Sequence, residues 1–135
     1  MNKVTTEVLD KIKSLMMSTV NESGGLLGTS NGKVIDLFWF DEGRRCNART
    51  YNPDVKRWEE RLLIWYDRKI EFCGIIHSHL NKQILSSRDV KMAREILKLN
   101  SINHVVMPVL VMKTGEVIWY LVSEERVDKF AIVVV

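Results

Sequence analysis

Two histidines separated by a single residue carry the strongest chemical signal in this sequence. His77 and His79 end an apolar run, and Asp89 follows shortly after them. Side chains alternate along an extended segment, so the two imidazoles project to the same face. With the nearby carboxylate they make three ligands for a divalent metal, and three protein ligands with an open fourth position are typical of catalytic zinc. The pattern predicts one catalytic Zn²⁺ bound by His77, His79 and Asp89.

Ser86 and Asp89 have a second interpretation, because their spacing is also that of a helix capping box. If Ser86 is the N-cap, Asp89 lies in the first turn of the helix, where the helix dipole favours a carboxylate. Capping alone does not explain the two histidines upstream. Both roles can hold together, since capping would fix the backbone that carries the ligand.

The arrangement of three short motifs resembles one enzyme family. The motifs are Glu22-Ser23-Gly24-Gly25-Leu26-Leu27-Gly28, then His77-Ser78-His79, then Ser86-x-x-Asp89. In this order they look like the signature of the JAMM (MPN-plus) zinc metalloproteases, in particular the small prokaryotic members, and they span most of the chain. The resemblance implies a cytidine-deaminase-like JAMM/MPN fold and zinc-dependent hydrolysis of a peptide or isopeptide bond.

The resemblance also implies roles for two further residues. Glu22 matches the family's catalytic glutamate, which hydrogen-bonds the zinc-bound water and passes its proton to the leaving amine. Ser86 matches the serine that helps to hold the developing oxyanion. The substrate is then a protein or peptide, and the family's substrates include ubiquitin-like and sulfur-carrier tails. The alternative is a non-catalytic MPN-type scaffold that binds a partner or a ubiquitin-like tail, although such relatives have lost the metal ligands.

The sequence departs from the family pattern after the second histidine. Leu80 stands where the family usually has proline, and residues 80–85 make six positions where the family usually has seven. Reading Ser87 as the motif serine restores the seven but puts Val90 in the place of the aspartate, and valine cannot bind a metal. We therefore assign Ser86 and Asp89 and expect a loop that is one residue shorter.

Composition excludes several other classes. The 135 residues indicate a single domain, 1–135. The net charge of +3 comes without a basic stripe, so we expect no nucleic-acid partner. No apolar run approaches the roughly 20 residues of a membrane helix, so we expect no membrane partner. The N-terminus lacks a signal-peptide pattern, which indicates a cytoplasmic protein with reduced Cys46 and Cys73. A base deaminase would need H-x-E and P-C-x-x-C, and neither motif is present.

Hydrophobic periodicity predicts the elements that position these residues. Helices are expected over Thr5–Val20, from Asn52-Pro53 onward with Val55, Trp58, Leu62, Trp65 and Tyr66 inward, and from a cap at Ser86 or Ser87 to about Leu99. The expected strands are a hairpin from Leu26 to Phe40 that turns at Asn31-Gly32, a buried strand over Ile70–Ile76, and strands over His104–Met112, Glu116–Val122 and Lys129–Val135. This order predicts a three-layer α-β-α fold, with a mixed sheet and helices on both faces.

Single residues near these motifs carry smaller predictions. Ser78 faces away from the histidines, so we expect it to make a structural hydrogen bond. Cys73 has the strand parity of the histidines and would face the metal in a regular strand, but we assign it to the core. Pro108 suggests an edge position or a bulge, and a short strand is expected around Ala48–Tyr51.

Overall fold

The computed structural model describes residues 1–44 and 50–135. Three helices and nine strands are assigned in these residues. Their bounds, in chain order, are β1 Lys3–Val4, α1 Thr6–Met16, β2 Gly24–Thr29, β3 Leu37–Asp41, α2 Val55–Asp67, β4 Glu71–His79, α3 Ser87–Asn100, β5 His104–Val106, β6 Val109–Val111, β7 Glu116–Ser123, β8 Val127–Phe130 and β9 Val133–Val134.

The main sheet is mixed and is built around β4. On one side β4 pairs antiparallel with β2, and β2 pairs antiparallel with β3. On the other side β5 and β6 lie end to end, both parallel to β4 and both antiparallel to β7. The strand β8 then adds to β7. The strand that ends in the two histidines is therefore flanked on both sides, which explains its apolar sequence.

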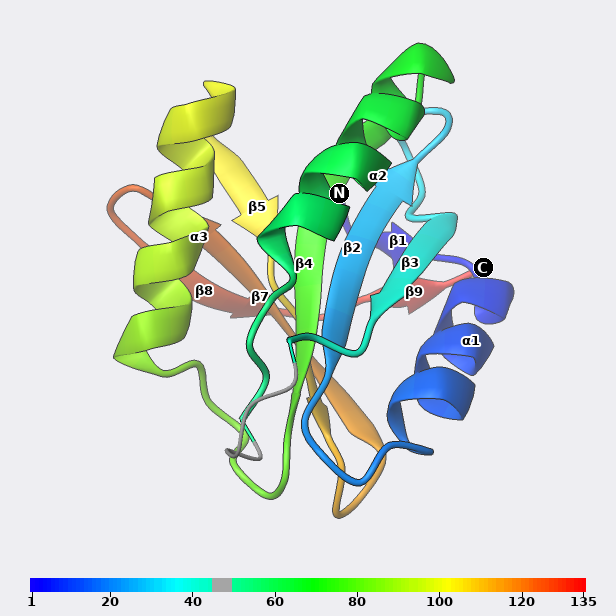
Figure 1. Cartoon of the computed structure of the whole chain (residues 1–135), viewed down its shortest axis with the longest axis vertical. Helices are drawn as coiled ribbons and strands as arrows, with labels where there is room; N and C mark the ends of the chain where they lie inside the picture. The colour runs from blue at the N-terminus through cyan, green and yellow to red at the C-terminus, as the bar shows by residue number, and fades with distance from the viewer. Residues whose placement is uncertain (45–49) are drawn as a thin grey trace.

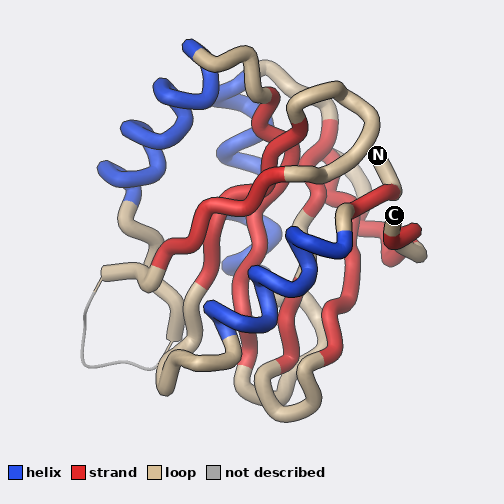
Figure 2. Tube along the Cα trace, turned by 90° about the vertical axis from the view of Figure 1, so that its right-hand side faces the viewer, coloured by secondary structure: helices blue, strands red, loops and turns tan. Residues whose placement is uncertain are grey.

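Helices cover both faces of this sheet, so the predicted three-layer fold is confirmed (Figures 1 and 2). The helix α1 packs on one face, where its Ile12 and Met16 share a core cluster with Leu27 and Ile76. The neighbouring strand residues, such as Ile75, face the other way and pack against Trp58 and Trp65 of α2. The helix α3 covers the same face as α2 through Ala93 and Leu97. The alternation of strand side chains thus builds two cores, one on each side of the sheet.

Side-chain hydrogen bonds mark the end of α1 and the start of α2, and both boundaries differ from the predicted ones. The first helix ends at Met16 and not near Val20, because the hydroxyls of Ser18 and Thr19 donate to the carbonyls of Leu15 and Met16. The helix α2 begins after Asp54, not at Asn52, since the Asp54 carboxylate accepts the N–H of Arg57.

The predicted apolar stripe of α2 is only partly correct. Trp58 and Trp65 are buried as expected, but Val55 and Tyr66 are 58% and 80% exposed. These two lie on the flanks of the stripe, beyond the reach of the sheet.

The predicted hairpin is confirmed, but its turn is longer than two residues. β2 ends at Thr29 and β3 starts at Leu37. Between them the Asn31 side chain accepts the N–H groups of Lys33 and Val34. Ile35 also leaves the hairpin to bridge with Val4 of β1. An Asn side chain that substitutes for backbone turn contacts allows this wider loop.

The two later strands are interrupted. The predicted strand over His104–Met112 breaks at Pro108, which has no N–H to give to a ladder. Of the two expected positions for Pro108, the sheet edge is wrong, because the residue lies between β4 and β7, where it interrupts the strand. The predicted strand over Lys129–Val135 divides into β8 and the short β9, which pairs with β1.

A β-bulge corrects the predicted parity of Cys73. The β2–β4 register shifts between Leu27 and Gly28, which face Gly74 and Phe72, so Cys73 has no opposite residue. Cys73 consequently packs against the α1 cluster and not toward the histidines. Its assignment to the core is confirmed, and its burial raises the pKa of its thiol to about 12. Cys46, and the Ala48 and Arg49 part of the expected short strand, lie outside the described residues; Thr50 and Tyr51 are not in a strand.

None of the helices in residues 1–44 and 50–135 is long and apolar enough to cross a membrane.

Candidate metal centre

The end of β4 brings both histidines to the face that α2 and α3 cover. His77 pairs with Gly24 of β2 on one side and with Val109 of β6 on the other, and it is 3% exposed. His79 pairs with Val111 and ends the strand. Pairing on both sides at His77 and with β6 at His79 fixes the backbone of the two histidines, and their side chains lie side by side with ring centroids 4.6 Å apart.

The first turn of α3 supplies the carboxylate. The Ser86 hydroxyl accepts the N–H of Asp89 at 3.1 Å, and the Asp89 carboxylate accepts the N–H of Ser86 at 2.9 Å. The predicted capping box is therefore present. The N–H of Ser86 is not the only neighbour of Oδ2 of Asp89, because the same oxygen also lies against Nε2 of both histidines. The capping and ligand interpretations of Asp89 are thus geometrically compatible.

Three donor atoms converge in a small triangle. Nε2 of His77 and Nε2 of His79 are 3.0 Å apart, and Oδ2 of Asp89 lies 3.1 Å from the first and 3.3 Å from the second. Two Nε2 atoms carry at most two protons, so protons cannot bridge all three edges. A cation at the centre contacts all three atoms. Zinc bonds of about 2.0–2.1 Å in a tetrahedral site place ligand atoms roughly 3.3 Å apart, so the donor set fits zinc.

The charges of the triangle suit a cation. Burial raises the pKa of Asp89, but hydrogen bonds from His77 and His79 outweigh it and hold that pKa well below its ordinary value. The hydrogen bond to Asp89 raises the pKa of His79. The Nδ1 atoms of both histidines are buried and have no hydrogen-bond partner among the described residues. The contacts of the two rings with each other and with Asp89 therefore use Nε2, the atom in the triangle.

Glu22 and Ser86 lie in the wall of the same cavity. This cavity of about 140 Å³ is lined by Glu22, Thr50, Tyr51, Pro53, His77, Ser86, Arg88, Asp89 and Met92. Glu22 is half-buried on the segment that leads into β2, and its Oε2 accepts the N–H of Leu80 at 2.9 Å. Glu22, His77, Ser86 and Asp89, from three separate segments, thus line one cavity, and His79 contacts His77 and Asp89 beside it.

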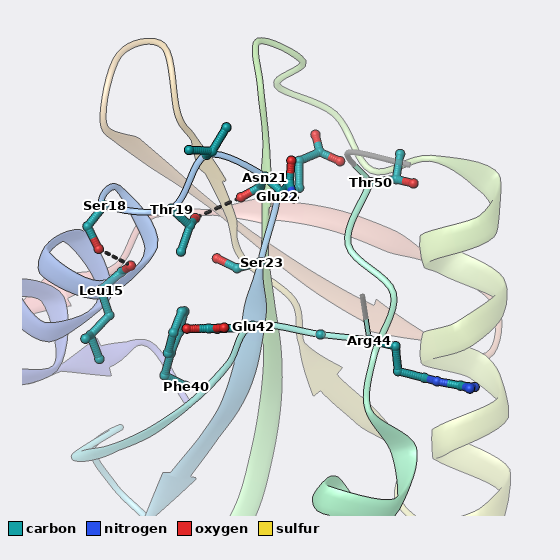
Figure 3. A pocket seen from close by; sticks show the side chains of 12 residues that line it. Leu15, Ser18, Thr19, Asn21, Glu22, Ser23, Phe40, Glu42, Arg44 and Thr50 are labelled. Carbon is teal, nitrogen blue, oxygen red and sulfur yellow. Dashed lines mark hydrogen bonds between the residues drawn. The ribbon is translucent and has the colours of Figure 1, made fainter. Parts of the chain in front are cut away.

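A second, larger cavity of about 630 Å³ lies on the other side of Glu22. It shares Glu22 and Thr50 with the first cavity and extends to the end of α1 and the residues after β3 (Figure 3). The side chain of Ser23 lines this cavity, and its hydroxyl is buried without a hydrogen-bond partner among the described residues. Glu22 is therefore shared by the cavity that holds His77 and Asp89 and by a larger space of about 630 Å³.

One wall of the site depends on a buried carboxylate that sequence reasoning missed. Asp41 is fully buried, and its Oδ2 accepts from the Tyr51 hydroxyl at 2.7 Å and from the Trp58 indole at 2.9 Å. The burial of Tyr51 and the nearby charge of Asp41 raise the pKa of the Tyr51 hydroxyl above its ordinary value. The Tyr51 ring fills the space beside Gly24, where a Cβ would come within 2.4 Å of it. Nothing in the sequence marks Asp41, because one acidic residue at the end of an apolar strand is common.

The shortened loop after β4 has a defined path. The carbonyls of His79 and Leu80 accept the N–H groups of Met112 and Lys113. The Tyr120 hydroxyl of β7 donates to the carbonyl of Gln83 at 2.7 Å. These contacts tie the loop to the neighbouring strands, and the six residues suffice to bring Ser86 and Asp89 over the histidines.

Comparisons with known proteins agree with this geometry at the level of the fold. No family model and no curated protein sequence matches the chain. Among solved structures, the protein DSY2949 from Desulfitobacterium hafniense aligns with a TM-score of 0.73 at 14% identity, over 100% of this chain and 93% of its own. The JAB1/MPN domain protein AF2198 from Archaeoglobus fulgidus aligns with a TM-score of 0.57 at 14% identity, over 99% and 97%.

A third structure describes JAMM, a metalloprotease-like zinc site in the proteasome and signalosome. It aligns with a TM-score of 0.56 at 14% identity, over 100% of this chain and 98% of its own. At this identity the alignments establish the fold, which is that of the JAB1/MPN structures. The group of His77, His79 and Asp89 fits the JAMM motif and could hold a metal ion.

Proposed function

We propose that this chain is a JAMM-type zinc hydrolase that cleaves a peptide or isopeptide bond. The observation that carries the proposal is the convergence of two imidazole nitrogens and one carboxylate oxygen within 3.0–3.3 Å of one another. The JAB1/MPN fold and the likeness to a structure with a metalloprotease-like zinc site support it.

The residues divide the chemistry between them. His77, His79 and Asp89 would hold Zn²⁺, which would act as a Lewis acid that acidifies water and polarises a carbonyl. Glu22 accepts a proton from the water that attacks the scissile carbonyl carbon, and then delivers that proton to the leaving nitrogen. The Ser86 hydroxyl accepts the N–H of Asp89, so its own proton is free to bind the developing oxyanion.

The substrate that fits this proposal is an extended polypeptide, such as the C-terminal tail of a ubiquitin-like or sulfur-carrier protein. The cavity beside the triangle is small, and it shares the lining residues Glu22 and Thr50 with the larger cavity. A chain running past Glu22 occupies both spaces and places one peptide bond beside the ligands. The non-catalytic scaffold is the alternative, and it predicts binding of such a tail without cleavage.

The test combines metal content with cleavage. Purified protein is analysed for zinc by mass spectrometry and then incubated with a peptide library made from digested cell extract, beside a ubiquitin-like protein that carries a C-terminal extension. We expect about one zinc per chain, and products that disappear with 1,10-phenanthroline and return with added zinc. His77→Ala is the control without metal. Stoichiometric zinc with no product from either substrate would favour the scaffold.

A further inference from the structure

The backbone N–H of Leu80 contacts the carboxylate that the proposed mechanism uses. It donates to Oε2 of Glu22 at 2.9 Å, directly after the strand that carries both histidines. We propose that this N–H is a positioning group: it holds one oxygen of Glu22 so that the other faces the attacking water. This inference rests on the proposed function, because it assigns a role to Leu80 within that reaction.

The donor is itself held rigidly. The carbonyls on either side of the Leu80 nitrogen, those of His79 and Leu80, accept N–H groups from Met112 and Lys113 at 2.8 and 3.0 Å. A donor fixed by two backbone hydrogen bonds can fix a flexible glutamate, whereas a free loop could not. The orientation of the Glu22 carboxylate is thus fixed relative to β4, the strand that carries both histidines.

The backbone of Glu22 is fixed to the same strand by a second contact. Ser78, which lies between the histidines, is fully buried, and its hydroxyl accepts the N–H of Ser23 at 2.8 Å. The N–H of Ser78 in turn donates to the carbonyl of Ser23 at 2.8 Å. Ser78 therefore makes the structural hydrogen bond that its position predicts. With the backbone anchored there, the Leu80 contact fixes the side chain.

One substitution removes this donor, and it introduces the proline that the resembled family usually has at this position. Proline has no N–H, and it requires an extended conformation of the residue before it, which His79 has as the last residue of β4. The Leu80 side chain is 40% exposed, so its replacement costs little packing. The carbonyl of residue 80 remains available to Lys113. Leu80→Ala is the matched conservative variant, since it loses the same side chain but keeps the N–H.

The hydrogen bond can be tested without any substrate. Amide hydrogen exchange, followed by NMR, should show a protected Leu80 amide in the wild type. In Glu22→Ala that protection should fall by about ten-fold or more, while the amide of Met112, which donates to His79, stays protected. Unchanged exchange at Leu80 in Glu22→Ala would overturn the inference whatever the protein hydrolyses. If the wild type cuts no substrate, the proposed function fails, and this measurement still decides the contact.

The positioning role is tested by turnover of the library peptide that the wild type cleaves fastest. Leu80→Pro should retain zinc and its KM but lose about 10- to 100-fold in kcat, the scale of a misplaced catalytic group. Leu80→Ala keeps the N–H, so its kcat should stay near the wild-type value. In a Glu22→Ala background Leu80→Pro should have no further effect, because it acts through Glu22. Unchanged kcat in Leu80→Pro, an equal loss in Leu80→Ala, loss of zinc in Leu80→Pro, or an additive double variant would each overturn the proposal.

Discussion

The Nε2 atoms of His77 and His79 are 3.0 Å apart, and both face the same oxygen of Asp89. Two imidazoles at positions i and i+2 of a strand normally project in parallel toward solvent or a core. Here both rings turn the same nitrogen to one point, and a helix from the far end of a loop brings a carboxylate to it. This convergence distinguishes the site from a pair of histidines that merely satisfy each other.

The metal should depend on each corner of this triangle. Asp89→Ala removes one of only three protein ligands, so we expect bound zinc to fall well below one per chain after dialysis, as in His79→Ala. The measurement is elemental analysis beside the wild type. Asp10→Ala, at an exposed position of α1, is the matched acidic control and should keep its zinc. Full zinc content in Asp89→Ala would mean that Asp89 only caps the helix.

Glu22→Gln should separate metal binding from catalysis. Glutamine keeps the shape of the side chain and an oxygen that can accept the Leu80 N–H, but it loses the basicity. We expect normal zinc content and a fall in turnover of about 10²–10⁴-fold, which is typical of a lost general base. Loss of zinc equal to that in Asp89→Ala would instead make Glu22 a ligand, and unchanged turnover would remove it from proton transfer.

Two substitutions of Ser86 can separate capping from catalysis. Ser86→Ala should lower the free energy of unfolding by about 1 kcal/mol, because the N–H of Asp89 loses its acceptor, whereas glycine at an N-cap costs only a few tenths. Both lose the hydroxyl donor, so both should lose turnover by a similar factor of about 10²–10³. The measurements are urea unfolding and kcat on the same preparations. Turnover that falls in Ser86→Ala but not in Ser86→Gly would limit Ser86 to capping.

The buried carboxylate of Asp41 should be important for stability. Asp41→Ala leaves the Tyr51 hydroxyl and the Trp58 indole N–H buried without their acceptor. Each unsatisfied donor costs roughly 1–3 kcal/mol, so we expect the free energy of unfolding to fall by about 3 kcal/mol. Urea unfolding measures this, with Asp10→Ala as control, which should change by less than about 0.5 kcal/mol. A change as small as the control would show that water replaces the carboxylate.

The Cys73 thiol should make stability fall at high pH. Burial, with smaller contributions from the charges of Asp36 and Glu71, raises its pKa from 9.0 to about 12. The thiol therefore ionises in the unfolded chain at a pH where it stays protonated in the folded one. The stability that the protonated Cys73 thiol contributes is fully present below pH 9 and is lost as the pH rises from 9 toward 12.

This effect is measured as the difference in urea unfolding between wild type and Cys73→Ala at pH 8 and pH 10. We expect the wild type to lose more stability than the variant between these values. In a Cys46→Ala background, the same burial should make Cys73 react with iodoacetamide much more slowly in the folded protein than in urea. Equal rates in both states would contradict the raised pKa.

The amino-acid sequence by itself determined the layer order and the group of His77, His79 and Asp89. Helical and strand periods are local properties, so the positions of α1, α3 and β4 and the capping of Ser86 follow from neighbouring residues. His77 and His79 share a face for the same reason. The pairing of these histidines with Asp89 came from motif spacing and was confirmed as a contact by the geometry.

Only the tertiary structure decided the contacts between distant segments. The bulge at Cys73 and the division of the last strand arise from pairing with other strands, which local periodicity does not report. The contact of Glu22 with Leu80 joins residues far apart in the chain through a backbone N–H, and that of Asp41 with Tyr51 joins a strand end to a buried phenol ten positions later. A backbone donor has no signature in the sequence, so its partner becomes visible only when the chain folds.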